Sequence, residues 1–474
     1  MPNIRYIFLS DTHFGANTSM LTNLKTASAD TDTSLPSPVL RQLVTCLREL
    51  VTKNEDESKP TLVLGGDILE LALTDTNIAA MAFERFVELV KPADGNDLVG
   101  EIFYLPGNHD HHLWEDARET QYVNYISNRP PGSQLDVPWH TTKMFVEKDP
   151  NPLPCYFLTK LVQRFDHLKA KNFQIYTAYP NFGLLSDDLR QGVIFTHGHF
   201  SEAIYTLMTT LRSTIFNGRK EPTMVWDIEA ENFAWIDFFW STLGRSGGVG
   251  ADIGLLYDKM QDKKQLNKIL SVIGHNLVKT HGIVGGLEKD AVTMLLEATV
   301  GHVATLERSI SAEALSGKTA EGWQKYVEGV LLSQLLLERD NTMPTTMTLV
   351  FGHTHKPFQK DMKFVGYPEW TSIYNSGGWV VDTEHTQPLH GGSVILVDEN
   401  HSVISLNMYL ENEDADAYTV EVNQATHLGA EKSAFYEHIS GLIDPTSTSW
   451  RKFSQVAAKE VAIRHRNLAA RIEE

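Results

Sequence analysis

Short apolar runs alternate with longer stretches of helical periodicity over the first hundred residues. Apolar positions recur at helical spacing in 38–53 and 77–90, which predicts two helices. Apolar runs rich in β-branched and aromatic residues precede, separate and follow them at 4–10, 61–64 and 101–105, and these predict strands. Strands that alternate with helices in this way are typical of a sheet with parallel neighbours.

Two later apolar runs, 192–195 and 345–351, predict further strands and are separated by a long addition. The addition is mostly helical in pattern, with helices expected over 202–216, 252–273, 290–304 and 320–339. Its glycine-rich stretch, 244–250, lacks the ending of a phosphate-binding P-loop and predicts a connector. We interpret the whole addition as a helical cap over the core.

Strand patterns return after the addition, and the chain ends in a charged stretch that is compatible with helix. The returning strands are expected at 371–381, 393–397 and 403–409. We therefore expect a discontinuous α/β core over 1–199 and 345–425, a large helical cap insertion over 200–344, and a helical C-terminal tail over 426–474.

The composition, with 42% hydrophobic and 21% charged residues, is ordinary for a soluble globular protein. The chain has only two cysteines, Cys46 and Cys155, which excludes a disulfide framework and a cysteine-rich zinc module and favours the cytoplasm. The formal net charge of −19 disfavours nucleic acid as a partner, because a negative surface repels phosphates.

No apolar run reaches the ~18 residues that a membrane span needs, and we expect no signal peptide at the N-terminus. The nearest candidate, 233–243, is short and contains Asp237, so it predicts a buried helix. Peripheral contact with a membrane surface stays open as an alternative. Association of the chain into a homo-oligomer also stays open.

Residue types that bind metals follow each of the first five predicted strands, which are 4–10, 61–64, 101–105, 192–195 and 345–351. These residues are Asp11 and His13, then Asp67, then Asn108, His109 and Asp110, then His197 and His199, and finally His353 and His355. Loops that leave the carboxyl ends of parallel strands meet at one edge of a sheet, so we expect these residues to converge. Taken singly, Asp11, Asp67 and Asn108 would be explained as turn or helix-cap residues.

Oxygen and nitrogen donors without any thiolate suit Mn²⁺, Fe or Zn²⁺ in a catalytic centre better than structural zinc. Two such ions, held about 3.5 to 4 Å apart by a shared carboxylate, polarise a phosphoryl group and supply hydroxide near neutral pH. Hydrolysis of a phosphoester is the reaction that this donor set favours.

The donors stand in five ordered blocks that resemble the calcineurin-like metallophosphoesterase superfamily. The blocks are Asp11-x-His13, Gly66-Asp67-x-x-Glu70, Gly107-Asn108-His109-Asp110, Thr196-His197-Gly198-His199 and Gly352-His353-Thr354-His355. The resemblance implies a β-sandwich flanked by helices, in a four-layer αββα arrangement.

The resemblance also implies a role for each residue. It assigns the first of two divalent metal ions to Asp11, His13 and His355, the second to Asn108, His197 and His353, and the bridge between them to Asp67. Mn²⁺ is the preferred ion, with Fe or Zn²⁺ as alternatives. A hydroxide that bridges the ions would attack phosphorus, with His109 as the general acid and Asp110 orienting its ring. Glu70 would cap a helix or orient Asp67, and His199 would support a ligand.

Within the superfamily, the stretches 352–357 and 374–379 are similar to the UDP-2,3-diacylglucosamine pyrophosphatase branch. His109 departs from that branch, which usually carries Arg at this position, and the helical addition is longer. The expected substrate is therefore a small-molecule phosphomonoester, phosphodiester or pyrophosphate. A nuclease of the same superfamily and a non-catalytic interaction scaffold are the alternatives.

Overall fold

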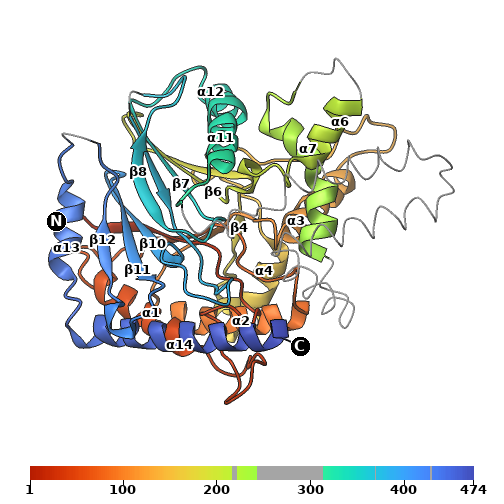
Figure 1. The fold of residues 1–474 in the computed structure, drawn as a ribbon. Coiled ribbons are helices and arrows are strands. Elements are labelled where there is room, and N and C mark those ends of the chain that lie inside the picture. Colours follow the sequence, from red (N-terminus) through yellow and green to blue (C-terminus); the bar gives the residue numbers. More distant parts are fainter. Residues whose placement is uncertain (216–220, 243–312, 369, 428–429, 474) are drawn as a thin grey trace, which may run out of the picture.

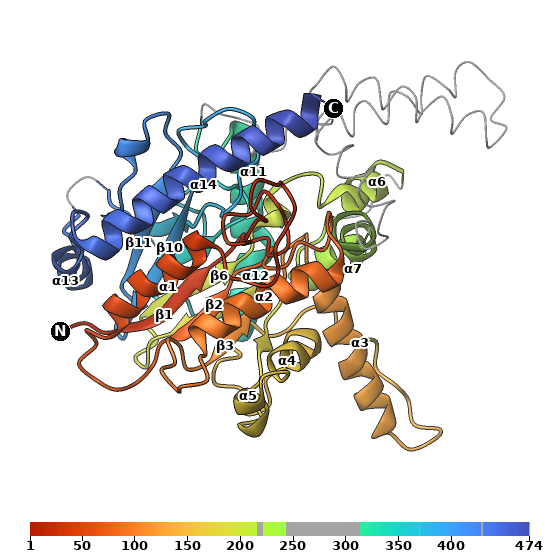
Figure 2. The same cartoon turned by 90° about the horizontal axis from the view of Figure 1, so that it is seen from below.

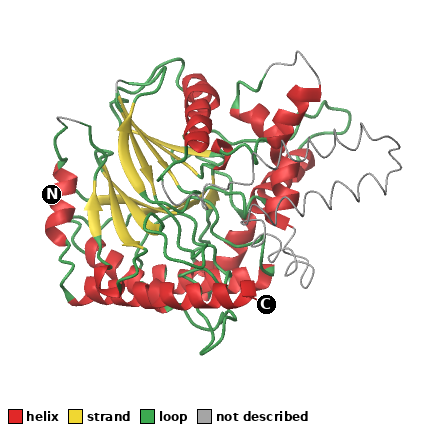
Figure 3. Cartoon of the chain, in the orientation of Figure 1, coloured by secondary structure: helices red, strands yellow, loops and turns green. Residues whose placement is uncertain are grey.

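The structure is a computed structural model that describes residues 1–215, 221–242, 313–368, 370–427 and 430–473. Two β-sheets stack face to face, and helices cover their outer faces (Figures 1 and 3). The first sheet has seven strands in the order β12-β11-β10-β1-β2-β3-β4. Its strands are β1 Ile4–Leu9, β2 Thr61–Leu64, β3 Ile102–Tyr104, β4 Tyr176–Thr177, β10 Gly391–Asp398, β11 Val403–Leu410 and β12 Glu421–Asn423.

The second sheet has five strands in the order β5-β6-β7-β9-β8. Its strands are β5 Asn181–Leu185, β6 Gln191–Thr196, β7 Thr346–Phe351, β8 Phe358–Met362 and β9 Thr371–Asn375. Strands β1, β2 and β3 are parallel neighbours in the first sheet, and β6, β7 and β9 are parallel neighbours in the second. The carboxyl ends of these strands carry the predicted donor residues.

Helices lie between the strands along the chain, and two more form its C-terminal part. They are α1 Pro38–Val51, α2 Thr76–Val90, α3 His112–Ser127, α4 Tyr156–Val162, α5 Asp166–Ala170, α6 Leu207–Ile215, α7 Val225–Trp235, α11 Gly317–Tyr326, α12 Leu332–Glu338, α13 Ala434–Leu442 and α14 Thr448–Glu473. The π-helical turns η2 Ile236–Thr242 and η5 Val327–Leu331 continue α7 and α11, and the 3₁₀ turn η1 covers His199–Ser201. Viewed from below, α14 crosses the sheet beside α1, and α3 projects from the body (Figure 2).

The alternation of side chains along the strands separates three apolar layers. Ile7 and Leu9 of β1 pack with the helices α1, α2 and α14. Phe8, between them in sequence, faces the second sheet and stacks on Phe195 of β6 with 5.3 Å between ring centroids. On the far side of the second sheet, Leu349 packs in a layer with Trp323 and its helical neighbours. Because successive side chains of a strand point to opposite faces, one sequence fills two layers, and the αββα architecture follows.

The five predicted strand positions before residue 352 and the helices 38–53 and 77–90 are confirmed within a few residues. The predicted helix 202–216 begins only at Leu207, because the preceding segment turns toward the donor residues. The predicted helix 320–339 is confirmed within a few residues, as one continuous helical segment of α11, η5 and α12 that packs on the outer face of the second sheet. The expected helices 252–273 and 290–304 and the stretch 244–250 lie outside the described residues.

The segment 233–243 was expected to be a buried helix, and the described part of it is buried on one side only. Ile236 and Trp240 are 0% and 4% exposed, whereas Phe238 is 62% exposed. Among the described residues, no helix combines the length and the apolar character that crossing a membrane requires. The helices of the predicted tail pack against β11 and α1, and the division of the chain into domains stays a prediction.

Candidate metal centre

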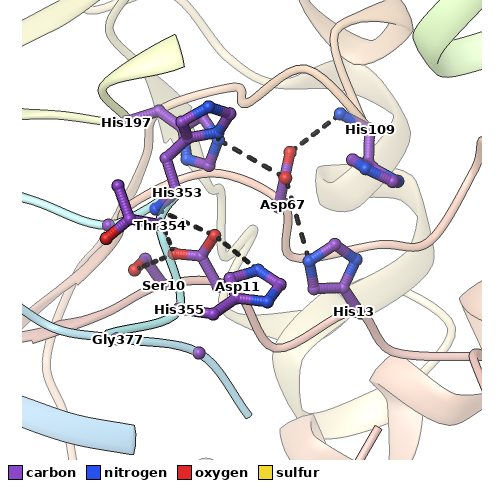
Figure 4. Close-up of polar contacts among 12 residues, drawn as sticks. Ser10, Asp11, His13, Asp67, His109, His197, His353, Thr354, His355 and Gly377 are labelled. Carbon is purple, nitrogen blue, oxygen red and sulfur yellow. Dashed lines mark hydrogen bonds and ion pairs between the residues drawn. The ribbon is translucent and has the colours of Figure 1, made fainter. Parts of the chain in front are cut away.

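Loops at the carboxyl ends of five strands bring the predicted donors to one place. The loops after β1, β2 and β3 come from the first sheet, and those after β6 and β7 come from the second. The labelled side chains of these loops point toward one another (Figure 4). The predicted ligands Asp11, His13, Asp67, Asn108, His197, His353 and His355 are all at most 2% exposed.

Several of these donors have a backbone conformation that side chains other than glycine rarely adopt. The φ angles of Asp11, His13, Asp67, His353 and His355 lie between 44° and 70°. Such a residue costs on the order of 1–3 kcal/mol and persists where surrounding contacts hold it, which is common at functional sites. The strained residues turn their side chains inward in the loops after β1, β2 and β7.

One group of donors consists of Asp11, His13 and His355, whose potential ligand atoms lie within 4.8 Å of one another. The Nε2 atom of His355 is 3.4 Å from Oδ1 of Asp11. Both Asp11 oxygens also accept the backbone N–H of His353, at 3.0 and 2.9 Å. This hydrogen bonding joins the loop after β1 to the loop after β7.

A second group consists of Asp67, His197 and His353, and Asn108 joins it. Oδ1 of Asn108 and Nδ1 of His353 lie 3.1 and 3.2 Å from Nε2 of His197. Oδ2 of Asp67 is 3.4 Å from Nε2 of His197 and 3.8 Å from Nε2 of His13. Asp67 therefore lies between the two groups, where a bridging ligand would be needed.

Each imidazole of the two groups is held by an acceptor at the nitrogen that faces away from the other donors. The contacts are His13 Nδ1 with Glu70 Oε2 at 2.8 Å, His197 Nδ1 with the Gly65 carbonyl at 3.0 Å, His353 Nε2 with Glu202 Oε1 at 2.7 Å, and His355 Nδ1 with an oxygen of Asp382. Such acceptors fix the ring tautomer, so that the lone pair of the other nitrogen points at a metal. The donor set is thus oriented for coordination.

A bound cation would give a close partner to two buried atoms of the set. Nε2 of His13 and Oδ2 of Asp67 make no hydrogen bond within the described part of the chain. Buried polar atoms without partners are costly in a folded protein. Carboxylate, amide and imidazole donors around them fit divalent transition-metal ions, and the residues present therefore fit a pair of such ions.

The charges of the site favour a cation as well. Burial opposes the ionisation of Asp11 and Asp67, but the surrounding imidazoles outweigh it and hold the pKa of both carboxyls below its ordinary value. Burial also disfavours the charged form of His197, yet Asp67 and Asp11 raise its pKa to about 9. A proton on His197 thus offsets part of the carboxylate charge, and bound divalent ions would replace that proton.

Glu70, rather than Asp110, orients the ring of His109, which corrects the expectation about Asp110. Oε1 of Glu70 lies 2.9 Å from Nδ1 of His109. The carboxylate of Asp110 instead accepts the backbone N–H groups of Gly107, Asp67, Ile68 and Leu69, at 2.7, 3.2, 2.7 and 3.2 Å. Asp110 therefore shapes the loop that carries Asp67.

The glycines of two blocks are required by close approach of the backbone to the carboxylates. A Cβ atom at Gly107 would collide with the side chain of Asp67. A Cβ atom at Gly352 would collide with the side chains of Asp11 and Ser10. The Gly-Asn and Gly-His pairs of the sequence thus reflect packing around the donors.

Three further histidines near the site have other partners. His199 lies among aromatic rings, 4.2 Å from Phe200 between centroids, and burial together with the charge of His197 lowers its pKa well below the usual range. His111 and His112 contact carboxylates of the α7 and η2 segment. His199 therefore lies beside the ring of His197 in surroundings that disfavour its charged form, and its role in supporting a ligand stays a prediction.

Three contributors to the site were missed in the sequence. Glu202 and Asp382 hold His353 and His355, and the hydroxyl of Tyr205 accepts a hydrogen bond from Nδ2 of Asn108 at 3.1 Å. Neither Glu202 nor Asp382 stands in a recognisable block, so short-range pattern offered no signal for them. Glu70 was visible in the second block, but its partners were not.

A family model agrees with this geometry, although no curated protein matches the chain. The model of one family, described as calcineurin-like phosphoesterase, matches residues 4–248, which is slightly more than half of the 474 residues. That segment contains the loops after β1, β2, β3 and β6, and the fold adds His353 and His355 to them. This protein therefore belongs to the calcineurin-like phosphoesterase family.

Proposed function

We propose that this protein is a hydrolase that uses two divalent metal ions to cleave a phosphomonoester, phosphodiester or pyrophosphate bond in a small molecule. The observation that carries the proposal is the position of Asp67 between two groups of oriented donors. Asp11, His13 and His355 would hold one ion, and Asn108, His197 and His353 would hold the other. Mn²⁺ is the preferred ion, with Fe or Zn²⁺ as alternatives.

When bound, the two ions would polarise the phosphoryl oxygens and lower the pKa of coordinated water. The residues of the chain prepare that chemistry by orientation and by proton transfer. Glu70 directs Nδ1 of His109 toward itself, so Nε2 is the ring atom that would donate a proton to the leaving oxygen. The carboxylate of Glu70 also favours the protonated ring, because it lies within 2.9 Å of it.

The role of general acid for His109 rests on the family resemblance of its block, because its ring also lies within 4.8 Å of ligand atoms of His13 and Asp67. The backbone N–H of His109 donates to Oδ1 of Asp67 at 2.8 Å, so the ring is carried beside the bridging carboxylate. His109 is 5% exposed, whereas Asp67 and Asn108 are 0% exposed. A ring at the margin of the site is suited to meet the leaving group of a substrate.

The nature of the substrate remains a prediction from sequence. The negative net charge of −19 argues against a nucleic acid backbone. The likeness of two short stretches to the UDP-2,3-diacylglucosamine pyrophosphatase branch keeps a nucleotide-sugar or lipid pyrophosphate among the candidates. The cytoplasm stays the predicted compartment.

A hydrolysis panel tests the proposal. The purified full chain is assayed with Mn²⁺ on monoesters, diesters, cyclic nucleotides, nucleotide-sugar pyrophosphates and single-stranded DNA, with Asp67→Ala as the inactive control. We expect turnover of at least one small-molecule class, and about two metal ions per chain at this centre. A chain that holds no metal and cleaves no phosphoester would overturn the proposal and support an interaction scaffold.

A further inference from the structure

A second cluster of possible metal ligands lies where the beginning of α3 meets α7 (Figures 1 and 2). It consists of His111, Glu115 and Glu229, which are 0%, 9% and 0% exposed. One ligand atom from each lies within 4.8 Å of the other two, the same spacing that relates the donors of the metal centre. Neither the mechanism nor the family match assigns this cluster a role.

The local structure explains how two of these side chains come to share one face. His111 precedes α3 but already has helical backbone angles, with φ −53° and ψ −32°. The backbone N–H of Glu115 donates to the carbonyl of His111 at 3.2 Å, which closes the first helical turn. Residues four apart on a helix are neighbours on its surface, so the imidazole and the carboxylate point the same way.

The third side chain comes from the opposite helix, and a core residue holds it. Glu229 of α7 places Oε1 2.8 Å from Nε2 of His111. The hydroxyl of Tyr179 donates to the other oxygen of Glu229 at 2.8 Å. A hydrogen bond to the outer oxygen of a carboxylate is the kind of contact that orients a metal ligand.

Two atoms of the cluster are buried without a partner. Nδ1 of His111 and Oε1 of Glu115 make no hydrogen bond to any residue that the structure describes. The other oxygen of Glu115 pairs with Arg118. A network of ion pairs alone would join His111 to Glu229 and Glu115 to Arg118, but it would leave both of these atoms unsatisfied, which is costly at such burial.

We propose that His111, Glu115 and Glu229 bind a third divalent transition-metal ion. One imidazole nitrogen and two carboxylate oxygens form a donor set suited to Zn²⁺ or Mn²⁺. The ion adds positive charge beside two buried carboxylates, of which Glu115 pairs with Arg118 and Glu229 with His111. Because its ligands come from α3 and α7, the ion fixes α7 to the core.

This site is separate from the metal centre. The ring of Tyr179 lies 5.5 Å from that of His111, His199 lies 6.3 Å beyond Tyr179, and His197 lies 5.6 Å beyond His199, between ring centroids. Two aromatic rings thus stand between the proposed ion and the ligand His197. The inference holds whether or not the proposed hydrolysis is correct.

Counting ions in the purified full chain tests the site. Wild-type protein is stripped of metal, equilibrated separately with Zn²⁺ and with Mn²⁺, and desalted. Inductively coupled plasma mass spectrometry then gives the number of metal ions per chain. We expect Glu229→Gln to lose about one ion per chain relative to wild type, with Tyr179 still able to hold the amide. Asp67→Ala should lose ions from the metal centre and keep the third one.

Glu119→Gln is the matched control, because Glu119 lies on the same helix with its side chain 65% exposed. This variant should bind as many ions as wild type. Crystals of the wild-type protein supply a measurement that depends on no variant, since anomalous scattering at the zinc and manganese edges locates each ion. A wild-type protein without an anomalous peak among His111, Glu115 and Glu229 for either metal would overturn the proposal and leave a structural ion-pair network.

Discussion

Glu70 connects the ligand His13 with the proposed acid His109, and its replacement by Gln should weaken metal binding. Oε2 contacts Nδ1 of His13 at 2.8 Å, and Oε1 contacts Nδ1 of His109 at 2.9 Å. Oε1 also accepts the backbone N–H groups of Ala72 and Leu73, each at 3.0 Å. Gln has nearly the same size as Glu, so the change alters hydrogen bonding more than packing.

The orientation of the new amide is fixed by the backbone. Because Ala72 and Leu73 donate to Oε1, that position must keep the oxygen, and the NH₂ group must face His13. An N–H group there makes Nδ1 of His13 an acceptor and moves the ring proton to Nε2. Nε2 is the atom that faces Asp67 at 3.8 Å, and a protonated nitrogen cannot bind a metal.

The expected loss is set by the size of such orienting contacts. Removing a partner that orients a metal ligand costs about 10- to 100-fold in metal affinity, or about 1.4–2.8 kcal/mol. The measurement is a titration of metal-free protein with Mn²⁺ or Zn²⁺ against a coloured chelator. Glu88→Gln is the control, since the side chain of Glu88 is 37% exposed on α2 and pairs with Arg85.

Two results would refute the reasoning about Glu70. If Glu70→Gln bound both ions as tightly as wild type, Glu70 would not set the tautomer of His13. If affinity stayed the same while turnover fell, Glu70 would act through His109 alone. Circular dichroism of the variant establishes that the fold is intact before either conclusion is drawn.

Four other outcomes are expected. Removal of the proposed acid in His109→Ala should leave metal content near that of wild type and slow turnover by about 10²- to 10⁴-fold, more for poor leaving groups than for p-nitrophenolate; a metal-free variant would make His109 a ligand. Gly107→Ala should reduce metal content, because its Cβ would displace Asp67, and unchanged metal content would contradict that packing. Metal affinity should rise with pH up to about 9, because an ion must displace the proton of His197, whose pKa is raised from 6.5 to about 9. By the same shift, the metal-free protein should lose stability as pH rises from 6.5 to about 9. Thermal unfolding across that range, with and without Zn²⁺, measures both effects. A metal-free protein that gains stability over this range, or a metal affinity that falls, would refute the assignment.

The strand positions were predictable because apolar runs of strand length are a local property of the chain. Runs such as 61–64 alternate between two buried faces, and they end where the polar donors begin. Asp67 and Asn108 could be proposed as ligands for the same reason, since parallel strands bring the residues at their carboxyl ends to one edge of the sheet. The helix 202–216 was misplaced at its start, because tertiary contacts of Glu202 and Tyr205 outweighed local helical preference.

The sequence by itself determined which donors exist and that each comes directly after a strand, because both facts are written in neighbouring residues. Only the tertiary structure decided which carboxylate serves which imidazole, as with Glu70 for His109 and Asp382 for His355. It also brought Glu229 of α7 to His111, across 118 positions of sequence. A hydrogen bond acts over about 3 Å in space, whatever the separation along the chain, so such partners are fixed by packing and leave no local pattern.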